Sequence, residues 1–308
     1  MSAMDQMMIG AGGGVPGVAG ATWTVQYGSG SLFFNSISCS STGQKVVAGT
    51  SNGSAYYSTN YGVSWSASSG GPSGSYEIAI SRDGSTALSA GGGGLYKSTD
   101  GGVTWSAAGT PAGTYISCAI SSDGNVMVAA KFGGYIYTSS DRGANWTART
   151  GAGALDWYNV AMSSDGTVMY AVSTSNYAHK STNSGATWSI MYSTSGGGTY
   201  GKIATSANGA VVALNNAGYG LLRLSTNSGS SFTNQAFDGY MGMGVSDDGK
   251  RIFVGSYTVC YVTDDTGAAW TARYPSGASD HWAMCCNADG SKAYAVTGST
   301  SGYVYSSP

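Results

Sequence analysis

One short string recurs along the whole 308-residue chain. The copy Ser98-Thr99-Asp100-Gly101-Gly102-Val103-Thr104-Trp105 represents it, and five other complete copies end at Trp65, Trp146, Trp188, Phe232 and Trp270. A seventh copy is split, because residues 303–307 open one and residues 20–23 close one. From Trp23 onward, these aromatic positions are 38 to 44 residues apart. A period of this length indicates one supersecondary unit used repeatedly.

A second marker keeps the same period. It is a Ser-x-Asp-Gly-like turn whose seven glycines are Gly43, Gly84, Gly124, Gly166, Gly209, Gly249 and Gly290. Two markers with seven copies each predict seven units. Each unit contains four short segments rich in β-branched and aromatic residues, for example 77–81, 86–90, 95–98 and 104–107, and none has helical periodicity.

The first strand of each unit favours a closed ring. Five residues before each turn glycine stands a small residue between two larger apolar ones: Ser38, Ala79, Ala119, Ala161, Ala204, Gly244 and Cys285. Sheets that radiate from an axis crowd there, so alternating sizes let inner strands approach. We therefore predict an all-β, seven-bladed β-propeller of four-stranded blades over residues 20–308. Its last blade is closed by the N-terminal strand pairing with the C-terminal strands, which removes both open edges.

The string S-x-D-x-G-x-T-W resembles the Asp-box, or BNR, repeat of sialidase-like, sortilin-like and photosystem-assembly-factor-like propellers. The resemblance implies a hairpin between the third and fourth strands of each blade, in which an Asp or Asn bonds turn amides and the Trp packs. That structural role would fall to Asn60, Asp100, Asp141, Asn183, Asn227 and Asp265. The box is specific for fold and carries little information on activity.

Composition excludes several classes of partner and cofactor. Only 9% of residues are charged and the net charge is −2, so nucleic acid and anionic membrane surfaces are not expected partners. No apolar run approaches the roughly 20 residues of a membrane span, and the start lacks the pattern of a secretory signal. Five cysteines without zinc-site spacing and two histidines predict no metal and no cofactor. In apolar strands, such cysteines behave as small buried hydrophobes.

The acidic residues supply little catalytic material. A sialidase would need three converging arginines and a Tyr/Glu pair, but the arginines are scattered and Glu77 is the single glutamate. Most aspartates belong to the turns and boxes, where bonding to the local backbone explains them. The remaining acids lie on the connections into inner strands: Glu77, Asp156, Asp238 and Asp280. The expectation is that the chain is not an enzyme, and the alternative is a carbohydrate-active hydrolase using these loop carboxylates.

Aromatic residues recur eight or nine positions before the turn glycines: Phe34, Tyr76, Tyr115, Trp157, Tyr158, Tyr200, Tyr240 and Trp282. In a propeller they would circle the channel mouth on the face opposite the boxes. Flat apolar rings with polar edges suit sugar stacking or a protein interface. They could equally plug the axis or pack between blades. As a candidate ligand-binding set, we group them with Asp156, Asp238 and Asp280.

Residues 1–19 form a Gly/Met-rich leader (MMIGAGGGVPG) that loosely resembles the leaders of tailed-phage structural proteins. This resemblance implies a virion component such as a tail fibre, spike or decoration protein, made in the host cytoplasm and attached to other virion proteins through the leader. The leading hypothesis is therefore a non-enzymatic propeller that presents an aromatic rim to a glycan or protein. Besides the hydrolase, an intracellular, cytoplasmic assembly scaffold stays open. The ligand, the host, the virion position and the oligomeric state are not determined by the sequence.

Overall fold

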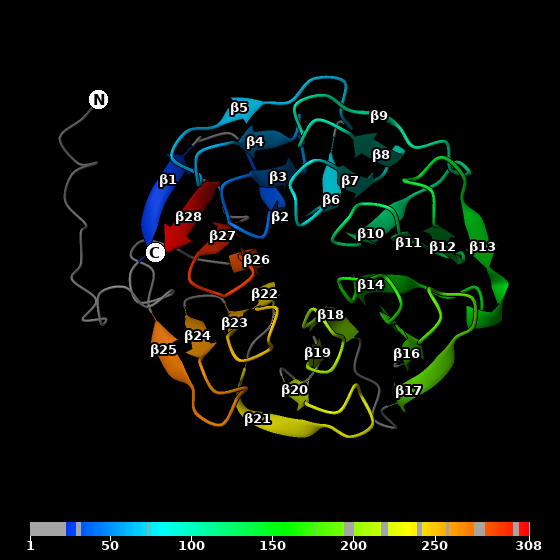
Figure 1. Ribbon diagram of the computed structural model, residues 1–308, viewed down its shortest axis with the longest axis vertical. Coiled ribbons are helices and arrows are strands. Elements are labelled where there is room, and N and C mark those ends of the chain that lie inside the picture. Colours follow the sequence, from blue (N-terminus) through cyan, green and yellow to red (C-terminus); the bar gives the residue numbers. More distant parts are fainter. Residues whose placement is uncertain are drawn as a thin grey trace.

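Seven four-stranded antiparallel sheets radiate from a central axis (Figure 1). This computed structural model describes residues 23–28, 32–72, 74–175, 177–193, 200–216, 221–238, 242–256, 259–273, 281–297 and 302–307. Within these ranges, the side chains at 26–28, 200, 216, 236–238, 281 and 282 are not described. The predicted seven-bladed β-propeller is confirmed.

The strands follow the chain from the axis outward in blades 1 to 6. Blade 1 contains β2 (Phe34–Cys39), β3 (Val46–Thr50), β4 (Tyr56–Ser58) and β5 (Ser66–Ala67), and blade 2 contains β6 (Ser75–Ile80), β7 (Ala87–Gly91), β8 (Gly94–Ser98) and β9 (Ser106–Ala107). Blade 3 contains β10 (Tyr115–Ile120), β11 (Met127–Lys131), β12 (Ile136–Ser139) and β13 (Thr147–Arg149), followed by the 3-10 helix η1 (Thr150–Ala152). Blade 4 contains β14 (Trp157–Met162), β15 (Met169–Ser173), β16 (Tyr177–Ser181) and β17 (Ser189–Ser193). Blade 5 contains β18 (Tyr200–Thr205), β19 (Val212–Asn216), β20 (Leu221–Ser225) and β21 (Thr233–Asp238), and blade 6 contains β22 (Gly242–Val245), β23 (Ile252–Gly255), β24 (Cys260–Thr263) and β25 (Thr271–Arg273).

Blade 7 is assembled from both parts of the split repeat. Its inner strands are β26 (His281–Cys286), β27 (Ala293–Thr297) and β28 (Tyr303–Ser307), and its outer strand is β1 (Thr24–Gly28). Strand β1 pairs with β28 in the register Thr24 to Ser306 and Val25 to Tyr305. The predicted closure by the N-terminal strand is confirmed, and Figure 1 shows β1 lying beside β28 at the edge of the ring.

The turn after each inner strand joins its neighbours in a closed backbone ring. The residue two positions before each turn glycine donates its N–H to the carbonyl of its counterpart in the next blade, starting with Ser41 N to Arg82 O at 2.8 Å and Arg82 N to Ser122 O at 3.1 Å. The series passes through Ser164, Ala207, Asp247 and Ala288, and Ala288 N returns to Ser41 O at 2.9 Å. Seven main-chain bonds therefore encircle the axis, and each satisfies a group that could not find a partner in its own hairpin.

The Asp boxes lie on the same side as these turns. In blade 2, Asp100 Oδ1 accepts the Thr104 N–H at 2.9 Å, Ser98 Oγ accepts the Gly102 N–H at 2.8 Å, and Trp105 Nε1 donates to the Gly102 carbonyl at 3.0 Å. Gly101 N then donates to Ser85 O in the turn of the same blade. Equivalent bonds hold the boxes of Asn60, Asp141, Asn183, Asn227 and Asp265. These acids and amides build hairpins by side-chain bonding to the local backbone.

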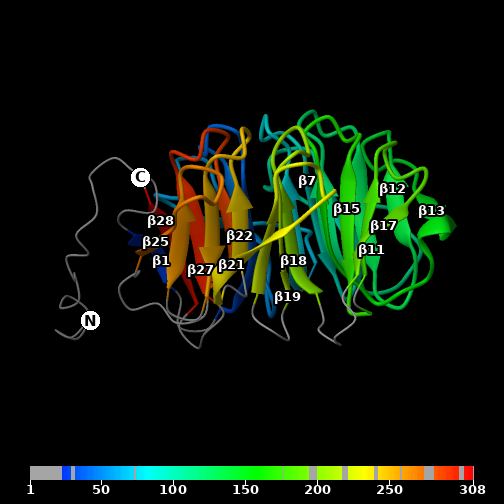
Figure 2. The same ribbon diagram turned by 90° about the horizontal axis from the view of Figure 1, so that it is seen from below.

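We call the side with the turns and boxes the box face, and the side where inner strands begin the rear face. The box face is turned to the viewer in Figure 1 and lies uppermost in the side view of Figure 2. Between the faces, hydrophobic clusters fill the spaces between adjacent blades; one joins Ala119, Val128 and Ile136 of blade 3 to Trp157 and Val160 of blade 4. The blades are thus held together by side chains pressed between sheets.

Candidate functional site

A β-bulge at the start of the inner strands sorts the aromatic residues into two groups. In six blades the pairing of the first two strands shifts at this point, as between Trp157 and Asn159 or between Tyr115 and Ser117. A bulge inserts one unpaired residue, so the residues on either side of it change direction. In every blade where its side chain is described, the residue nine positions before the turn glycine is buried. In contrast, Tyr76 and Tyr158, eight positions before the glycine, are exposed.

The expectation of a continuous aromatic rim is therefore corrected for three residues. Phe34, Tyr115 and Trp157 have no exposed surface, because the strand directs them into the packing between blades. Trp157, for instance, packs edge-on against His179 with ring centroids 5.0 Å apart. Of the other candidates, Tyr240 lies outside the described residues, and so do the side chains of Tyr200 and Trp282.

Four exposed aromatic side chains share the rear side of blades 2 to 4. Tyr76 and Tyr158 occupy bulge positions and are 45% and 42% exposed. Phe132, in the loop between β11 and β12, is 53% exposed, and Tyr177, at the start of β16, is 39% exposed. The sequence pattern of the inner strands did not predict Phe132 and Tyr177. Both residues follow the second strand of a blade, and the turns at that point lie on the rear face, so this position could have indicated them.

A polar layer crosses the channel near the rear face. Seven positions before the turn glycines, the inner strands present Ser36, Glu77, Ser117, Asn159, Lys202, Gly242 and Ala283. The Glu77 carboxylate accepts hydrogen bonds from Lys202 Nζ at 2.6 Å, Ser36 Oγ at 3.1 Å and Asn159 Nδ2 at 3.2 Å. A cavity of about 90 Å³ adjoins this network on the side of Gly242 and Ala283.

The Glu77 to Lys202 ion pair joins blades 2 and 5 across the axis. Burial by itself lowers the pKa of Lys202, but the adjacent Glu77 carboxylate outweighs burial, and the pKa is raised. Glu77 was grouped with acids on connecting loops; this placement is corrected, because it is an inner-strand residue bonded inside the channel. An acid held by three donors in this way is a structural partner, not a free carboxylate at the surface.

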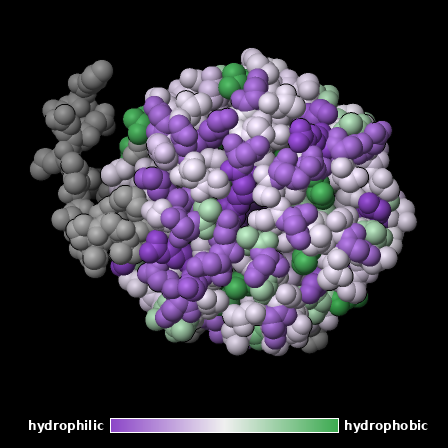
Figure 3. Space-filling model, in the orientation of Figure 1, coloured by the Kyte–Doolittle hydropathy of each residue, from purple (hydrophilic) through white to green (hydrophobic). Residues whose placement is uncertain are grey.

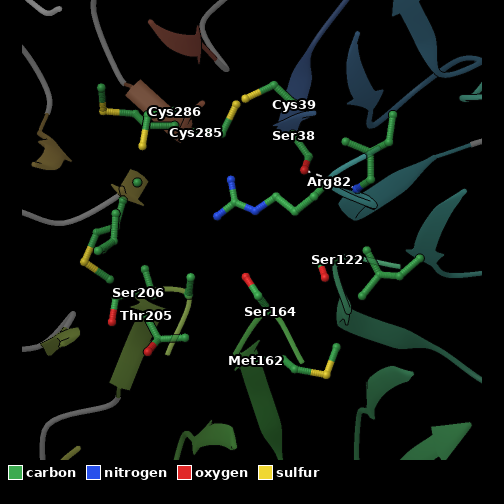
Figure 4. Close-up of a pocket in the computed structure, with 18 residues that line it drawn as sticks. Ser38, Cys39, Arg82, Ser122, Met162, Ser164, Thr205, Ser206, Cys285 and Cys286 are labelled. Atoms are coloured by element: carbon green, nitrogen blue, oxygen red, sulfur yellow. Dashed lines mark hydrogen bonds between the residues drawn. The ribbon is translucent and has the colours of Figure 1, made fainter. Parts of the chain in front are cut away.

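A second cavity, of about 190 Å³, opens at the box-face end of the channel. Figure 4 shows the Arg82 side chain extending into it, with Ser122, Ser164 and Thr205 among the residues around it. The Arg82 guanidinium donates to the Asp247 carboxylate, so a second ion pair spans the axis, from blade 2 to blade 6. Figure 3 shows hydrophilic residues gathered around this mouth, while hydrophobic ones are scattered singly.

The candidate carboxylates are only partly described. Asp156 is exposed on the rear face, and its Oδ1 lies 3.8 Å from the position a Cβ on Gly133 would take. Asp280 and the side chain of Asp238 lie outside the described residues. The proposed grouping of these three acids with the aromatic rim therefore stays a prediction.

The cysteines differ in environment. Cys39, Cys118, Cys260 and Cys286 are buried, and Cys285 is partly exposed beside the mouth cavity. Among the residues that the structure describes, no group of three or more His, Cys, Asp or Glu side chains is arranged to hold a metal ion. Likewise, the described part of the chain has no helix with the length and apolar character needed to span a bilayer.

Comparison with known proteins supports the fold. No protein-family model matches the sequence, and no curated protein matches it. Among solved structures, the chain is similar to the GH74 xyloglucanase from Xanthomonas campestris, with a TM-score of 0.72 and 16% identity over 90% of this chain. The similarity covers 52% of the xyloglucanase chain, so this chain spans about half of its length. The chain is an Asp-box-type, seven-bladed β-propeller similar in fold to that glycoside hydrolase.

Proposed function

We propose that this propeller is a non-enzymatic, glycan-binding component of a phage particle, and that its binding surface is the rear face of blades 2 to 4. The observation that carries the proposal is the exposure of Tyr76, Phe132, Tyr158 and Tyr177 on that side of three successive blades. Exposed tyrosines offer a flat apolar ring for stacking and a hydroxyl for hydrogen bonding.

Polar groups accompany the rings, as a sugar site requires. Tyr158 lies close enough to Lys202 to contribute to the raised pKa of that lysine, so the aromatic side chain adjoins the polar layer at the rear end of the channel. Asp156 is exposed on the same side. Binding sites for small polar ligands combine apolar walls with a few placed polar groups, and this side of the molecule supplies both.

Calorimetric titration with xyloglucan oligosaccharides tests the binding role, and the similarity to a xyloglucanase selects this first probe. We expect Tyr158→Ala to weaken binding about tenfold, because loss of one aromatic stacking partner removes about 1 to 1.5 kcal/mol. Tyr61→Ala is the matched control, since Tyr61 is also 42% exposed but lies in a box on the opposite face. Unchanged affinity in the double variant Tyr76→Ala/Tyr158→Ala would exclude the rear face.

The hydrolase alternative has its own test in the same samples. Reducing-end release from the polysaccharide, lost in Asp156→Asn, would replace the binding role with catalysis by a loop carboxylate. Binding to a host or virion protein without any affinity for glycans would instead favour a protein interface. The hydrolase alternative is retained because the similar structure is a glycoside hydrolase.

The proposal that the chain is part of a phage particle is based on residues 1–19, and it has its own test. We expect mass spectrometry of purified particles to find the chain, and a variant lacking residues 1–15 to fold but to be absent from particles. Recovery of the full chain from host cytoplasm alone would favour the intracellular scaffold.

A further inference from the structure

Each pair of neighbouring inner strands makes one equivalent contact close to the box face. The residue five positions before a turn glycine packs toward the following blade, as Ala119 does against the cluster containing Trp157. The residue four positions before a turn glycine packs toward the preceding blade, as Ile80 does beside Val47. The two kinds of residue therefore approach one another at all seven interfaces.

Six of these seven contacts contain at least one chemically inert partner. In chain order the pairs are Ser38 with Ile80, Ala79 with Ile120, Ala119 with Met162, Ala161 with Thr205, Ala204 with Val245, Gly244 with Cys286, and Cys285 with Cys39. Only the last pair, between blade 7 and blade 1, brings two thiols together. The other six interfaces serve as an internal comparison, because they show that packing at this position does not require sulfur.

The two thiols are in direct contact. Cys39 and Cys285 belong to one hydrophobic cluster and their side chains share a hydrogen bond. Figure 4 shows their sulfur atoms turned toward one another, with the Cys286 side chain directed away from them. Cys39 is 6% exposed and Cys285 is partly exposed, and both line the cavity of about 190 Å³ at the box-face mouth. A small solute in that cavity therefore reaches both thiols, of which Cys285 is the more exposed.

We propose that Cys39 and Cys285 are an oxidation site at which hydrogen peroxide forms an intramolecular disulfide. The Cys285 thiolate attacks one peroxide oxygen, the O–O bond breaks, and hydroxide leaves, giving a sulfenic acid. The Cys39 thiolate then attacks the Cys285 sulfur, the S–S bond forms, the S–O bond breaks, and a second hydroxide leaves. The two thiols lose two electrons to the peroxide, and their two protons convert both hydroxides to water.

The bond would act at the closure of the ring. Strands β26 to β28 are held against β1 by non-covalent contacts, the pairing of β28 with β1 and the packing of Trp23 in the cluster of Tyr305, whereas β1 continues along the chain into blade 1. A Cys39 to Cys285 bond would close a covalent loop of 246 residues (285 − 39). Because a cross-link restricts the unfolded chain more as its loop lengthens, we expect the oxidised protein to melt about 5 to 10 °C higher than the reduced protein.

The reaction rate should depend on pH. Burial raises the pKa of Cys285 well above its usual value, the neighbouring Cys39 thiol adds to this effect, and the positive charge of Arg82 opposes it. Since the thiolate is the nucleophile, oxidation is slow at neutral pH and accelerates as pH rises. Removing the positive charge in Arg82→Gln should slow the first step further.

Peptide mapping of the full chain, treated with hydrogen peroxide and digested without reductant, tests the proposal. We expect a linked peptide containing Cys39 and Cys285, a protein mass lower by two hydrogens, and reversal by dithiothreitol. Cys39→Ala and Cys285→Ser should abolish both the link and the rise in melting temperature. Cys118→Ser and Cys260→Ser should change neither, because each of these thiols contacts non-cysteine atoms.

Two results would overturn the proposal. One is a folded, peroxide-treated wild-type protein in which Cys285 is linked to Cys286. The other is Cys285 converted to sulfinic acid while Cys39 remains a free thiol. Both are read from the wild-type chain, so the test does not depend on the folding of a variant. The inference is also independent of glycan binding, which concerns the other face.

Discussion

The two faces of this propeller are stabilised by different kinds of interaction. On the box face, the closed main-chain ring passes through all seven blades, and the bonds from box side chains to the nearby backbone recur in blades 1 to 6, with the Arg82 to Asp247 ion pair as the blade-specific addition. On the rear face, buried aromatics, exposed aromatics and an axial ion pair differ from blade to blade. The comparison teaches that the repeat specifies one face, while the other is left to vary.

The largest effect is expected from opening blade 7, on which the closed backbone ring depends. Deleting residues 303–308 removes β28 and the register that joins it to β1. The deletion exposes two strand edges and leaves the cluster around Tyr305 unfilled. We expect loss of cooperative urea unfolding, followed by tyrosine and tryptophan fluorescence. A sharp transition at the wild-type midpoint would show that ring closure does not require this strand.

Substitutions at two adjacent residues on the rear face should have very different effects on the free energy of unfolding. Trp157→Ala removes a side chain with no exposed surface and should cost about 3 to 5 kcal/mol of unfolding free energy. Tyr158→Ala removes a side chain that is 42% exposed and should change it by less than about 0.5 kcal/mol. Chemical denaturation of both variants measures the contrast. Similar losses would mean that the bulge does not separate packing from display.

Breaking the axial ion pair between Glu77 and Lys202 should lower the free energy of unfolding by a smaller but still large amount. Glu77→Gln leaves the half-buried Lys202 ammonium without its carboxylate partner, at a cost of about 3 kcal/mol. In Glu77→Gln/Lys202→Met no charge remains uncompensated, so we expect part of that stability to return. A double-mutant cycle of unfolding free energies provides the measurement. An additive cycle would assign the two residues independent roles.

Acid should weaken the box face first. Hydrogen bonds from the Asn145 backbone and side chain, and from Ser139, lower the pKa of Asp141 from 3.8 to about 2. Its contribution is fully present above pH 3.8 and is lost as the pH falls toward about 2, because the unfolded chain binds the proton more tightly. Asp141→Asn should therefore make the urea midpoint less dependent on pH in this range. Asn183 already makes the equivalent bond without titrating.

The blade count and closure could be predicted from the sequence because both markers use residue types that their backbone bonds require. Which aromatic residues are exposed on the rear face could not be predicted. The residues eight and nine positions before the turn glycine are adjacent in sequence, and the bulge directs one into the core and the other to the surface, as for Trp157 and Tyr158. The partnership of Glu77 with Lys202 was also missed, because the two residues stand on blades 2 and 5. Their equal distance from a turn glycine was the signal that would have placed both in one layer.

The closed ring of seven hydrogen bonds uses main-chain atoms only, so the side chains at its seven positions form none of these bonds. Ser41, Arg82, Ser122, Ser164, Ala207, Asp247 and Ala288 already include four residue types, and the ring requires only that none be proline, which lacks the N–H. A combinatorial library at these seven positions would keep the main-chain ring constant while changing the chemistry of one mouth, where Arg82 and Asp247 now form an ion pair. The propeller could therefore serve as a scaffold from which variants that bind a chosen ligand at the box-face mouth of the channel are selected.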